Sequence, residues 1–262
     1  MATKLNDTLH LEVNFETYIT KKLAMLKKDG GWRISNDDTG FDPNTALYLP
    51  DFIEYVSSTE PEKVAKMQKS FGSNWENNLK LQLVKALETR GTVLTVRDGF
   101  QMAGYQTITC SGQYPDDPRL PKLKPYYDKN ILRVMRQVHY QTAGKKSLDL
   151  VFFVNGIPVA TTEVKTELTQ TVADAILEYQ NERKPIEPGT NRKNFLLMYK
   201  RGAVVHFAIS ENEIWMCTDL SPKQPKFLPF NRGTEDGHAG NPPVKKDDKD
   251  YPTGYFWNDI CL

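Results

Sequence analysis

The sequence predicts an α/β fold in which a mixed central sheet is flanked by helices. Two strongly apolar segments within residues 147–165 are joined by Asn155-Gly156, a pattern typical of a β-hairpin. Apolar residues at helical spacing precede this hairpin and follow it, and more strand-like segments come after the second helix. A chain of 262 residues can bury a sizeable core, either in one large domain or in a domain with an added lobe.

The first expected element is a helix over residues 11–28, which stops at Gly30-Gly31. Further helices are expected over residues 63–71 and 75–89, so the fold has additional helices before its sheet. A strand follows over residues 133–141, then the hairpin, then a helix over 172–183. Later strands are expected over residues 195–199, 203–209 and 213–218. Residues 232–253 are rich in Gly, Pro, Asp and Lys and should form a loop or linker.

Three ionisable residues lie in the apolar hairpin. Asp149 is near the start of its first strand, and Glu163 and Lys165 end the second. Removing such groups from water is costly unless a partner or a metal compensates their charge. Two carboxylates supply hard oxygen ligands, which suit Mg²⁺ or Mn²⁺ better than zinc, and a nearby lysine can stabilise developing negative charge. The hairpin therefore predicts a metal-dependent hydrolytic site.

The alternative for these charges is a salt-bridged strand end at the surface, where Lys165 pairs with Glu163 or Glu167. The apolar residues on both sides of Asp149 favour the metal site, because they indicate a central strand buried on both faces.

Because side chains alternate between the two faces of a strand, the loop length of the hairpin decides whether Asp149 and Glu163 share a face. Glu163 and Lys165 share a face, but a two-residue loop in a regular ladder would place Asp149 opposite Thr162. A three-residue loop, or a β-bulge within either strand, would place Asp149 opposite Glu163. We therefore predict an odd-length loop or a bulge.

Residues 119–146 contain eight basic residues and one acid, Asp128, although the whole chain has a net charge of only +1. Tyrosines lie among these basic residues. This composition is typical of a surface that contacts phosphates, and it leads directly into the strand that carries Asp149. The alternative is a solvated, lysine-rich loop. The candidate DNA contacts are Lys124, Lys129, Arg133, Arg136, Lys145 and Lys146.

The sequence also predicts whether Glu16 and the histidines are buried or exposed. Glu16 lies one position from the apolar stripe of the first helix and is expected to be exposed; the alternative is a third carboxylate at the metal. His139 and His206 are expected in or near the core, and His10 and His238 at the surface.

Cysteine spacing and hydropathy indicate which classes of protein can be set aside. The three cysteines are widely spaced, which indicates neither a disulfide framework nor a zinc cluster. Neither a signal peptide nor a bilayer-spanning segment is evident, so we expect a soluble, cytoplasmic protein without membrane contact.

Several segments, read in order, carry a family resemblance. They are residues 136–140 (RQVHY), 147–150 (SLDL), 155–160 (NGIPVA), 163–165 (EVK), 170–180, 227–233 (FLPFNRG) and 239–243 (AGNPP), and residues 15–32 extend the match toward the N-terminus. In this order they resemble PD-(D/E)xK nucleases. More closely, they resemble the N-terminal nuclease region of the R (restriction) subunit of type I restriction enzymes.

The resemblance implies a role for each matching residue. Asp149 and Glu163 would bind Mg²⁺, which Mn²⁺ can replace, and the backbone carbonyl of Val164 would complete the coordination. Lys165 would be the catalytic lysine, and Leu148 stands where the family motif has proline. Relatives also carry a Gln-x-x-x-Tyr motif on the following helix. Tyr179 matches its tyrosine, whereas Ala175 occupies the glutamine position, and Gln180 or Arg183 are the candidates to replace that glutamine.

The resemblance further implies a type I site-specific deoxyribonuclease, in which this region cuts double-stranded DNA without sequence preference. The implied partners are the methyltransferase (M) and specificity (S) subunits, and ATP would act only through a motor domain absent from this chain. Gly144-Lys145-Lys146-Ser147 is not an ATP-binding loop, because His139 stands where such a loop needs glycine. The nuclease domain is expected over residues 1–232, with a core of about 131–220, and residues 233–262 as a loop or linker toward the motor.

Two alternatives stay open at this point. One is a stand-alone repair nuclease of the same fold, which would cut without ATP. The other is a non-catalytic module that docks DNA or partner subunits. Even for the favoured family, an isolated region without its motor can be inactive.

Overall fold

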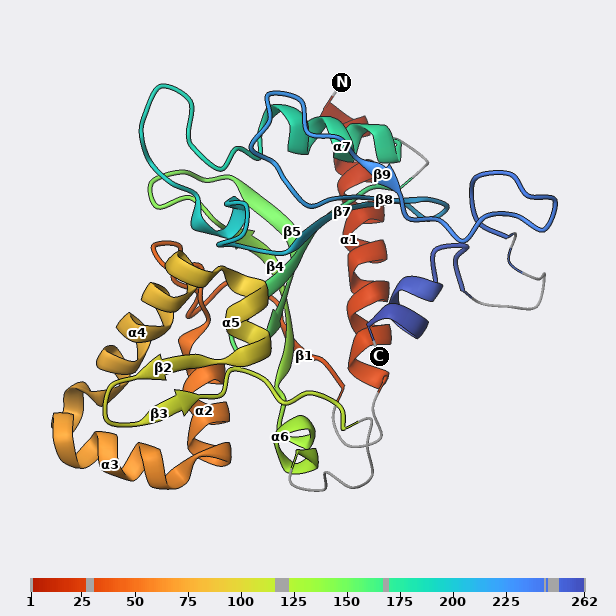
Figure 1. Cartoon of the computed structure of the whole chain (residues 1–262). Helices are drawn as coiled ribbons and strands as arrows, with labels where there is room; N and C mark the ends of the chain where they lie inside the picture. The colour runs from red at the N-terminus through yellow and green to blue at the C-terminus, as the bar shows by residue number, and fades with distance from the viewer. Residues whose placement is uncertain are drawn as a thin grey trace.

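The computed structural model describes residues 2–26, 31–115, 123–166, 170–242, 244 and 250–261, with side chains from residue 14 onward. Its centre is a seven-stranded mixed sheet in the order β1-β4-β5-β6-β7-β8-β9 (Figure 1). The pairs β1–β4 and β6–β7 are parallel and the others are antiparallel. The strands are β1 (Arg33–Ser35), β4 (Leu132–His139), β5 (Ser147–Val154), β6 (Ile157–Val164), β7 (Val205–Ile209), β8 (Ile214–Cys217) and β9 (Leu228–Pro229).

Helices flank the sheet, so the predicted α/β class is confirmed, and the arrangement is that of a restriction-endonuclease-like fold. Short helical turns occur at Gly72–Asn74, Phe195–Leu197 and Phe256–Ile260. A separate two-stranded ribbon pairs β2 (Phe100–Met102) with β3 (Gln106–Ile108). The helices are α1 (Ala2–Met25), α2 (Leu49–Thr59), α3 (Pro61–Phe71), α4 (Trp75–Arg90), α5 (Thr92–Asp98), α6 (Lys124–Asp128) and α7 (Val172–Asn181).

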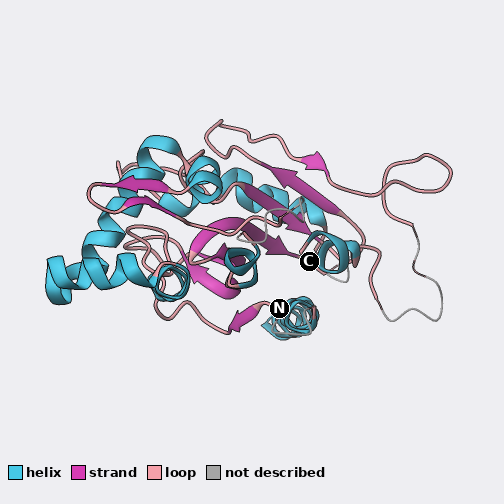
Figure 2. Ribbon diagram, turned by 60° about the horizontal axis from the view of Figure 1, so that its bottom comes forward, coloured by secondary structure: helices cyan, strands magenta, loops and turns pink. Residues whose placement is uncertain are grey.

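One face of the sheet is covered by α1, which Figure 2 shows nearly end-on beneath the strands. Phe15, Ile19 and Leu23 recur every four residues on one side of this helix and pack with Phe152 and Val164 of the sheet. Each fully buried side chain of this size contributes about 1.5–3 kcal/mol to folding. The apolar stripe that predicted the helix is therefore the stripe that docks it.

The other face of the sheet packs against α7. Tyr179 lies in one cluster with Met135, Val151 and Phe153, and it is fully buried. Strand β5 thus contributes alternate residues to both clusters, as predicted for a central strand buried on both faces.

A third cluster of buried side chains joins helices α2, α3 and α4 and the β2–β3 ribbon into a lobe (Figure 1). This lobe lies beside the hairpin turn. Asn155 and Gly156 form this turn with positive φ angles of 49° and 75°. Asn155 is completely buried: its Oδ1 accepts from the N–H of Ile131 at 2.7 Å, and its Nδ2 donates to the carbonyl of Cys110 at 2.9 Å. The backbone carbonyl of Gly156 accepts from the N–H of Tyr48 at 2.9 Å. The lobe is therefore bonded to the turn that sets the register of the hairpin.

Most predicted elements are present, with α1 longer at its start than expected. The predicted strand over residues 195–199 is wrong. Its backbone forms a tight helical turn, in which the N–H of Leu197 donates to Asn194, because a short apolar run does not by itself distinguish a strand from a buried turn. Helices α2, α5 and α6, the short strands β1 and β9, and the β2–β3 ribbon were not predicted from the sequence.

The last described segment packs into the core instead of leaving it. Phe256 and Trp257 are buried in the cluster of α1, and Trp257 donates to Asp250 at 3.2 Å. Tyr18 of α1 donates to the same carboxylate at 3.0 Å. The C-terminal end of the predicted linker over residues 233–262 therefore belongs to the folded core.

The predicted locations of the histidines are only partly confirmed. His206 is buried and His238 is exposed, as expected, whereas His139 is exposed and bonded to Asp38 at the end of β4. The side chain of His10 lies outside the described residues. The cysteines are free thiols, and none of the described helices is both long and apolar enough to cross a bilayer.

Candidate active site

The hairpin contains a β-bulge, one of the two forms that the side-chain alternation predicted. Its turn has two residues, but the ladder between β5 and β6 shifts by one residue after Phe152. Strand β6 thus carries one extra residue. Beyond the bulge Leu150 pairs with Thr162. In this register the next residues, Asp149 and Glu163, lie across from one another, and the charge of Asp149 acts on Glu163. The prediction of an odd-length loop or a bulge is confirmed in its second form.

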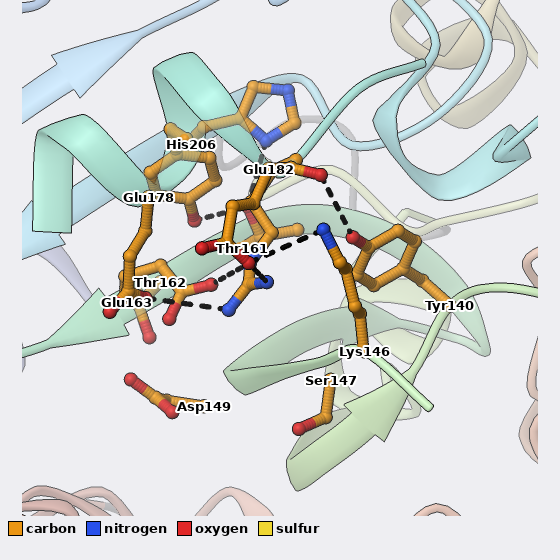
Figure 3. Close-up of polar contacts among 12 residues, drawn as sticks. Tyr140, Lys146, Ser147, Asp149, Thr161, Thr162, Glu163, Glu178, Glu182 and His206 are labelled. Atoms are coloured by element: carbon orange, nitrogen blue, oxygen red, sulfur yellow. Dashed lines mark hydrogen bonds and ion pairs between the residues drawn. The ribbon is translucent and has the colours of Figure 1, made fainter. Parts of the chain in front are cut away.

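Asp149 and Glu163 approach one another from neighbouring strands. In Figure 3 Asp149 lies below Glu163 and Glu178, and the three carboxylates point toward one another. Asp149 is held in place because its Oδ2 accepts from the backbone N–H of Val164 at 2.7 Å. The side chain of Val164 packs on the opposite face, in the cluster of α1, so only its backbone borders the two acids.

Lys165 lies on the same face as Glu163, and both side chains are buried. Its Nζ is 2.9 Å from Oε1 of Glu178, a residue of α7 that the sequence analysis did not single out. The alternative of a surface strand end is therefore wrong, because neither charge is at the surface; Glu167 lies outside the described residues.

Arg183 follows directly after α7 and reaches the hairpin. Its Nε donates to Oε1 of Glu163 at 2.5 Å, and a second guanidinium nitrogen is 3.4 Å from Oε2 of Glu178. Glu178 thus contacts both cations of the site, Lys165 and Arg183. Of the two candidates to replace the missing glutamine, Arg183 is the one that the structure brings to the carboxylates.

Tyr179 and Gln180 lie beside this group rather than in it. The hydroxyl of Tyr179 is 2.8 Å from Oγ1 of Thr161, which in turn lies 2.8 Å from Nδ1 of the buried His206. Gln180 donates to the backbone carbonyl of Pro225 at 3.0 Å. Tyr179 therefore supports the strand next to Glu163, and Gln180 anchors a loop.

Glu16 of α1 reaches the site from the other face of the sheet, contrary to the expectation that it is exposed. It is 3% exposed, and its Oε2 lies 3.1 Å from a guanidinium nitrogen of Arg136. Its Oε1 accepts from Nε2 of Gln137 at 3.1 Å, and the same nitrogen donates to Oδ1 of Asp149 at 3.2 Å. Gln137, which the sequence analysis did not identify, thus links Glu16 to Asp149.

Burial makes the charged forms of these acids unfavourable. It raises the pKa of Asp149, and together with the charge of Asp149 it raises the pKa of Glu163 well above its usual range, although Arg183 opposes this. Burial and the charge of Asp149 also raise the pKa of Glu16 to about 7 against the opposing effect of Arg136. A bound proton or a nearby cation would therefore stabilise each of the three carboxyls in its buried position.

The donor set suits a hard divalent cation. Among the side chains that the structure describes, no group of three His, Cys, Asp or Glu residues is arranged to hold a metal ion. The oxygen donors that could hold such a cation are Asp149 and Glu163 together with backbone carbonyls, and Mg²⁺ accepts such a set when water and phosphate fill the remaining positions. A cation between the two acids would offset the charge that burial penalises.

Two of the predicted DNA contacts instead hold the fold together. The guanidinium of Arg133 binds both carboxylate oxygens of Asp51, at 2.7 and 2.8 Å, and stacks on the ring of Tyr48. Arg136 is paired with Glu16. Because both arginines are largely buried in these pairs, the structure does not place them on a DNA-contacting surface.

Lys124 begins α6 and Lys129 follows this helix, so both precede β4 on the side away from Gln137. They line a cavity of about 670 Å³. Lys124 pairs with Asp128, and Lys129 donates to the backbone carbonyl of Ser58. Positive charge in this cavity is thus partly compensated; Arg119 and Lys122 lie outside the described residues.

Lys145 and Lys146 directly precede β5 and are exposed. Lys146 is 3.3 Å from Glu182, and Figure 3 shows both beside the site. Of the predicted DNA contacts, these two are exposed next to the strand that carries Asp149.

A comparison of the sequence with known proteins gives a family match that includes most of these residues. No curated protein matches the chain. A family model described as "Type I restriction enzyme R protein N terminus" matches residues 16–225, a range that includes Glu16, the whole hairpin and α7. Because this match spans well over half of the sequence, the chain belongs to the family of N-terminal regions of type I restriction enzyme R proteins.

Proposed function

We propose that this chain is a Mg²⁺-dependent endonuclease region that hydrolyses phosphodiester bonds of double-stranded DNA. Family membership supports a role in a restriction system. The observation that carries the nuclease activity is the bulged hairpin, which brings Asp149 opposite Glu163 and keeps Lys165 on the same face.

Asp149 and Glu163 would hold the metal ion, with the backbone carbonyl of Val164 as a further oxygen ligand. When bound there, Mg²⁺ polarises a phosphate oxygen and lowers the pKa of the attacking water, and Mn²⁺ can replace it. The raised pKa values of the two acids support this assignment, because the pair is short of positive charge.

Lys165 has the position and the positive charge of a group that stabilises the transition state of the reaction. Its ammonium shares a face with Glu163, and Glu178 orients it. From there it can donate a hydrogen bond to the attacking water or to a phosphate oxygen that gains negative charge. Arg183 compensates the charge of Glu163 from the side of α7.

Exposed Lys145 and Lys146 supply positive charge for the DNA backbone next to these acids. In the complete enzyme, sequence recognition would come from the methyltransferase and specificity subunits, and translocation from an ATP-driven motor. This region would then cut without sequence preference of its own.

Calorimetric titration with Mn²⁺ tests the metal site. We expect the parent chain to bind Mn²⁺, and Asp149→Ala or Glu163→Ala to weaken this binding at least tenfold. A parent chain that does not bind Mn²⁺ would contradict the proposal.

Cleavage by the assembled enzyme tests Lys165. We expect Lys165→Ala to abolish cutting while DNA binding and Mn²⁺ binding persist, and Lys85→Ala, which changes an exposed lysine of α4, to cut like the parent. An enzyme that still cuts with Lys165→Ala would remove the role assigned to this residue.

A further inference from the structure

Gln137 has a backbone conformation that strand residues rarely adopt. Its φ is +50° within β4, in the left-handed region, which is unfavourable for a residue with a side chain. Residues in such conformations gather at functional sites, where the surrounding structure holds them in place.

The direction of the side chains changes at this residue. On a regular strand, residues three apart lie on opposite faces. Met135 and Val138 nevertheless lie in the same cluster, and so do Leu148 and Val151 on the facing part of β5. Both strands therefore break their alternation at the same point, which on β4 is Gln137.

The break lets two consecutive side chains reach one acid. Arg136 and Gln137 would point to opposite faces of a regular strand, yet both bind Glu16, each at 3.1 Å. The left-handed conformation turns Gln137 so that its amide lies between Glu16 and Asp149.

Both polar atoms of this amide have hydrogen-bond partners. Nε2 donates to Oε1 of Glu16 and to Oδ1 of Asp149, and Oε1 accepts from the hydroxyl of Ser147 at 3.1 Å. When Glu16 and Asp149 are ionised they can only accept hydrogen bonds, so the NH₂ group then faces the two acids and the carbonyl faces the hydroxyl. The chemistry of the three partners thus sets the orientation of Gln137.

We propose that Gln137 is the positioning residue of the metal site. It orients Asp149 from one side while the backbone N–H of Val164 orients it from the other, and it ties this acid to Glu16 on α1. The inference rests on the proposed function, since it assigns Asp149 as a metal ligand. Partners that orient metal ligands in this way typically account for 10- to 100-fold in metal affinity.

Gln137→Gly separates this role from a purely structural one. Glycine adopts a positive φ more readily than glutamine, so a residue needed only for the backbone could be replaced without loss. We expect Gln137→Gly to unfold cooperatively without metal and to bind Mn²⁺ at least tenfold more weakly by calorimetry. The matched control is Gln106→Gly, because Gln106 is exposed at the start of β3 and has a φ of 61°; its Mn²⁺ affinity should equal that of the parent.

Ser147→Ala provides a second measurement that does not touch the strained position. It frees the amide carbonyl and should weaken Mn²⁺ binding two- to fivefold in the parent but not in a Gln137→Gly background. If Gln137→Gly fails to fold, unchanged Mn²⁺ affinity in Ser147→Ala overturns the inference.

The outcomes distinguish this inference from the proposed function. If the parent binds Mn²⁺ through Asp149 and Gln137→Gly binds it equally well, the positioning role is wrong and the metal site stands. If the parent does not bind Mn²⁺, both are wrong.

Discussion

The guanidinium of Arg183 lies against the carboxylate of Glu163, with Nε 2.5 Å from Oε1, and the two side chains are only 10% and 1% exposed. The group that meets the acid comes from just beyond α7 (Val172–Asn181), whereas Ala175 lies within that helix. Burial and Asp149 raise the pKa of Glu163, and Arg183 counteracts them. Arg183 therefore favours the ionised form of Glu163, which a metal ligand needs.

Removing this guanidinium should destabilise the chain. Arg183→Gln leaves a buried carboxylate without its cation, which typically costs about 3–5 kcal/mol. We expect a loss of this size in the free energy of unfolding, measured by urea denaturation. Arg97→Gln is the matched control, because Arg97 pairs with Asp98 at the surface, and it should change stability little. If Glu163→Gln, added to Arg183→Gln, recovers no stability, the buried charge is not the cause.

Glu16 determines part of the pH dependence of stability. Its pKa rises from 4.5 to about 7 in the folded chain, mainly through burial, so the folded state holds a proton that the unfolded state releases. Such a group contributes stability that is complete below pH 4.5 and is lost as the pH rises through 7. We expect the unfolding free energy of the metal-free chain to fall across this interval, and less steeply for Glu16→Gln. Denaturation at several pH values measures both slopes, and a steeper fall for the variant would contradict the assignment.

Lys145 and Arg133 should respond differently to removal. Lys145→Ala should lower the slope of log affinity for DNA against log salt by about one while stability is unchanged. Arg133→Ala removes both hydrogen bonds to the buried Asp51 and should cost a few kcal/mol of unfolding free energy. Fluorescence anisotropy at several salt concentrations and urea denaturation test the pair. A stable Arg133→Ala variant with a reduced salt slope would return Arg133 to the DNA surface.

Gly156 should not tolerate a side chain. A Cβ added there would lie 2.1 Å from the backbone carbonyl oxygen of Tyr48, so the lobe would have to move away from the hairpin. Gly104→Ala is the control, because Gly104 has a similar φ of 82° and no neighbouring atom within 4 Å of its added Cβ. Gly104→Ala should lose about 1–2 kcal/mol from its backbone conformation alone, and Gly156→Ala clearly more, as measured by thermal unfolding. Equal losses would mean that the lobe adjusts without cost.

Much of the site could be read from local patterns. The apolar run around Asp149 predicted a strand buried on both faces. Alternation required an odd-length loop or a bulge if Asp149 and Glu163 share a face, and the structure has the bulge. These inferences succeed because the direction of a strand side chain depends on its nearest neighbours in sequence.

Other residues could not be placed in this way. Glu16 lies beside the apolar stripe of α1, and its burial depends on Arg136, which is 120 residues away in the sequence. Arg133 lies in a basic stretch of the sequence, which predicted a surface position, but in the structure it pairs with the buried Asp51. No sequence pattern indicates that Gln137 adopts a left-handed conformation.

The sequence by itself thus determined the hairpin, the residue types of the candidate metal site and the family to which the chain belongs. Only the tertiary structure decided which groups lie against these side chains: Glu178 pairs with Lys165, and Arg183 pairs with Glu163. The neutral amide of Gln137 donates hydrogen bonds to both Glu16 and Asp149. The reason is physical. Strand alternation is a local property of the backbone, whereas the partner of a buried charge is selected by whichever distant element packs against it.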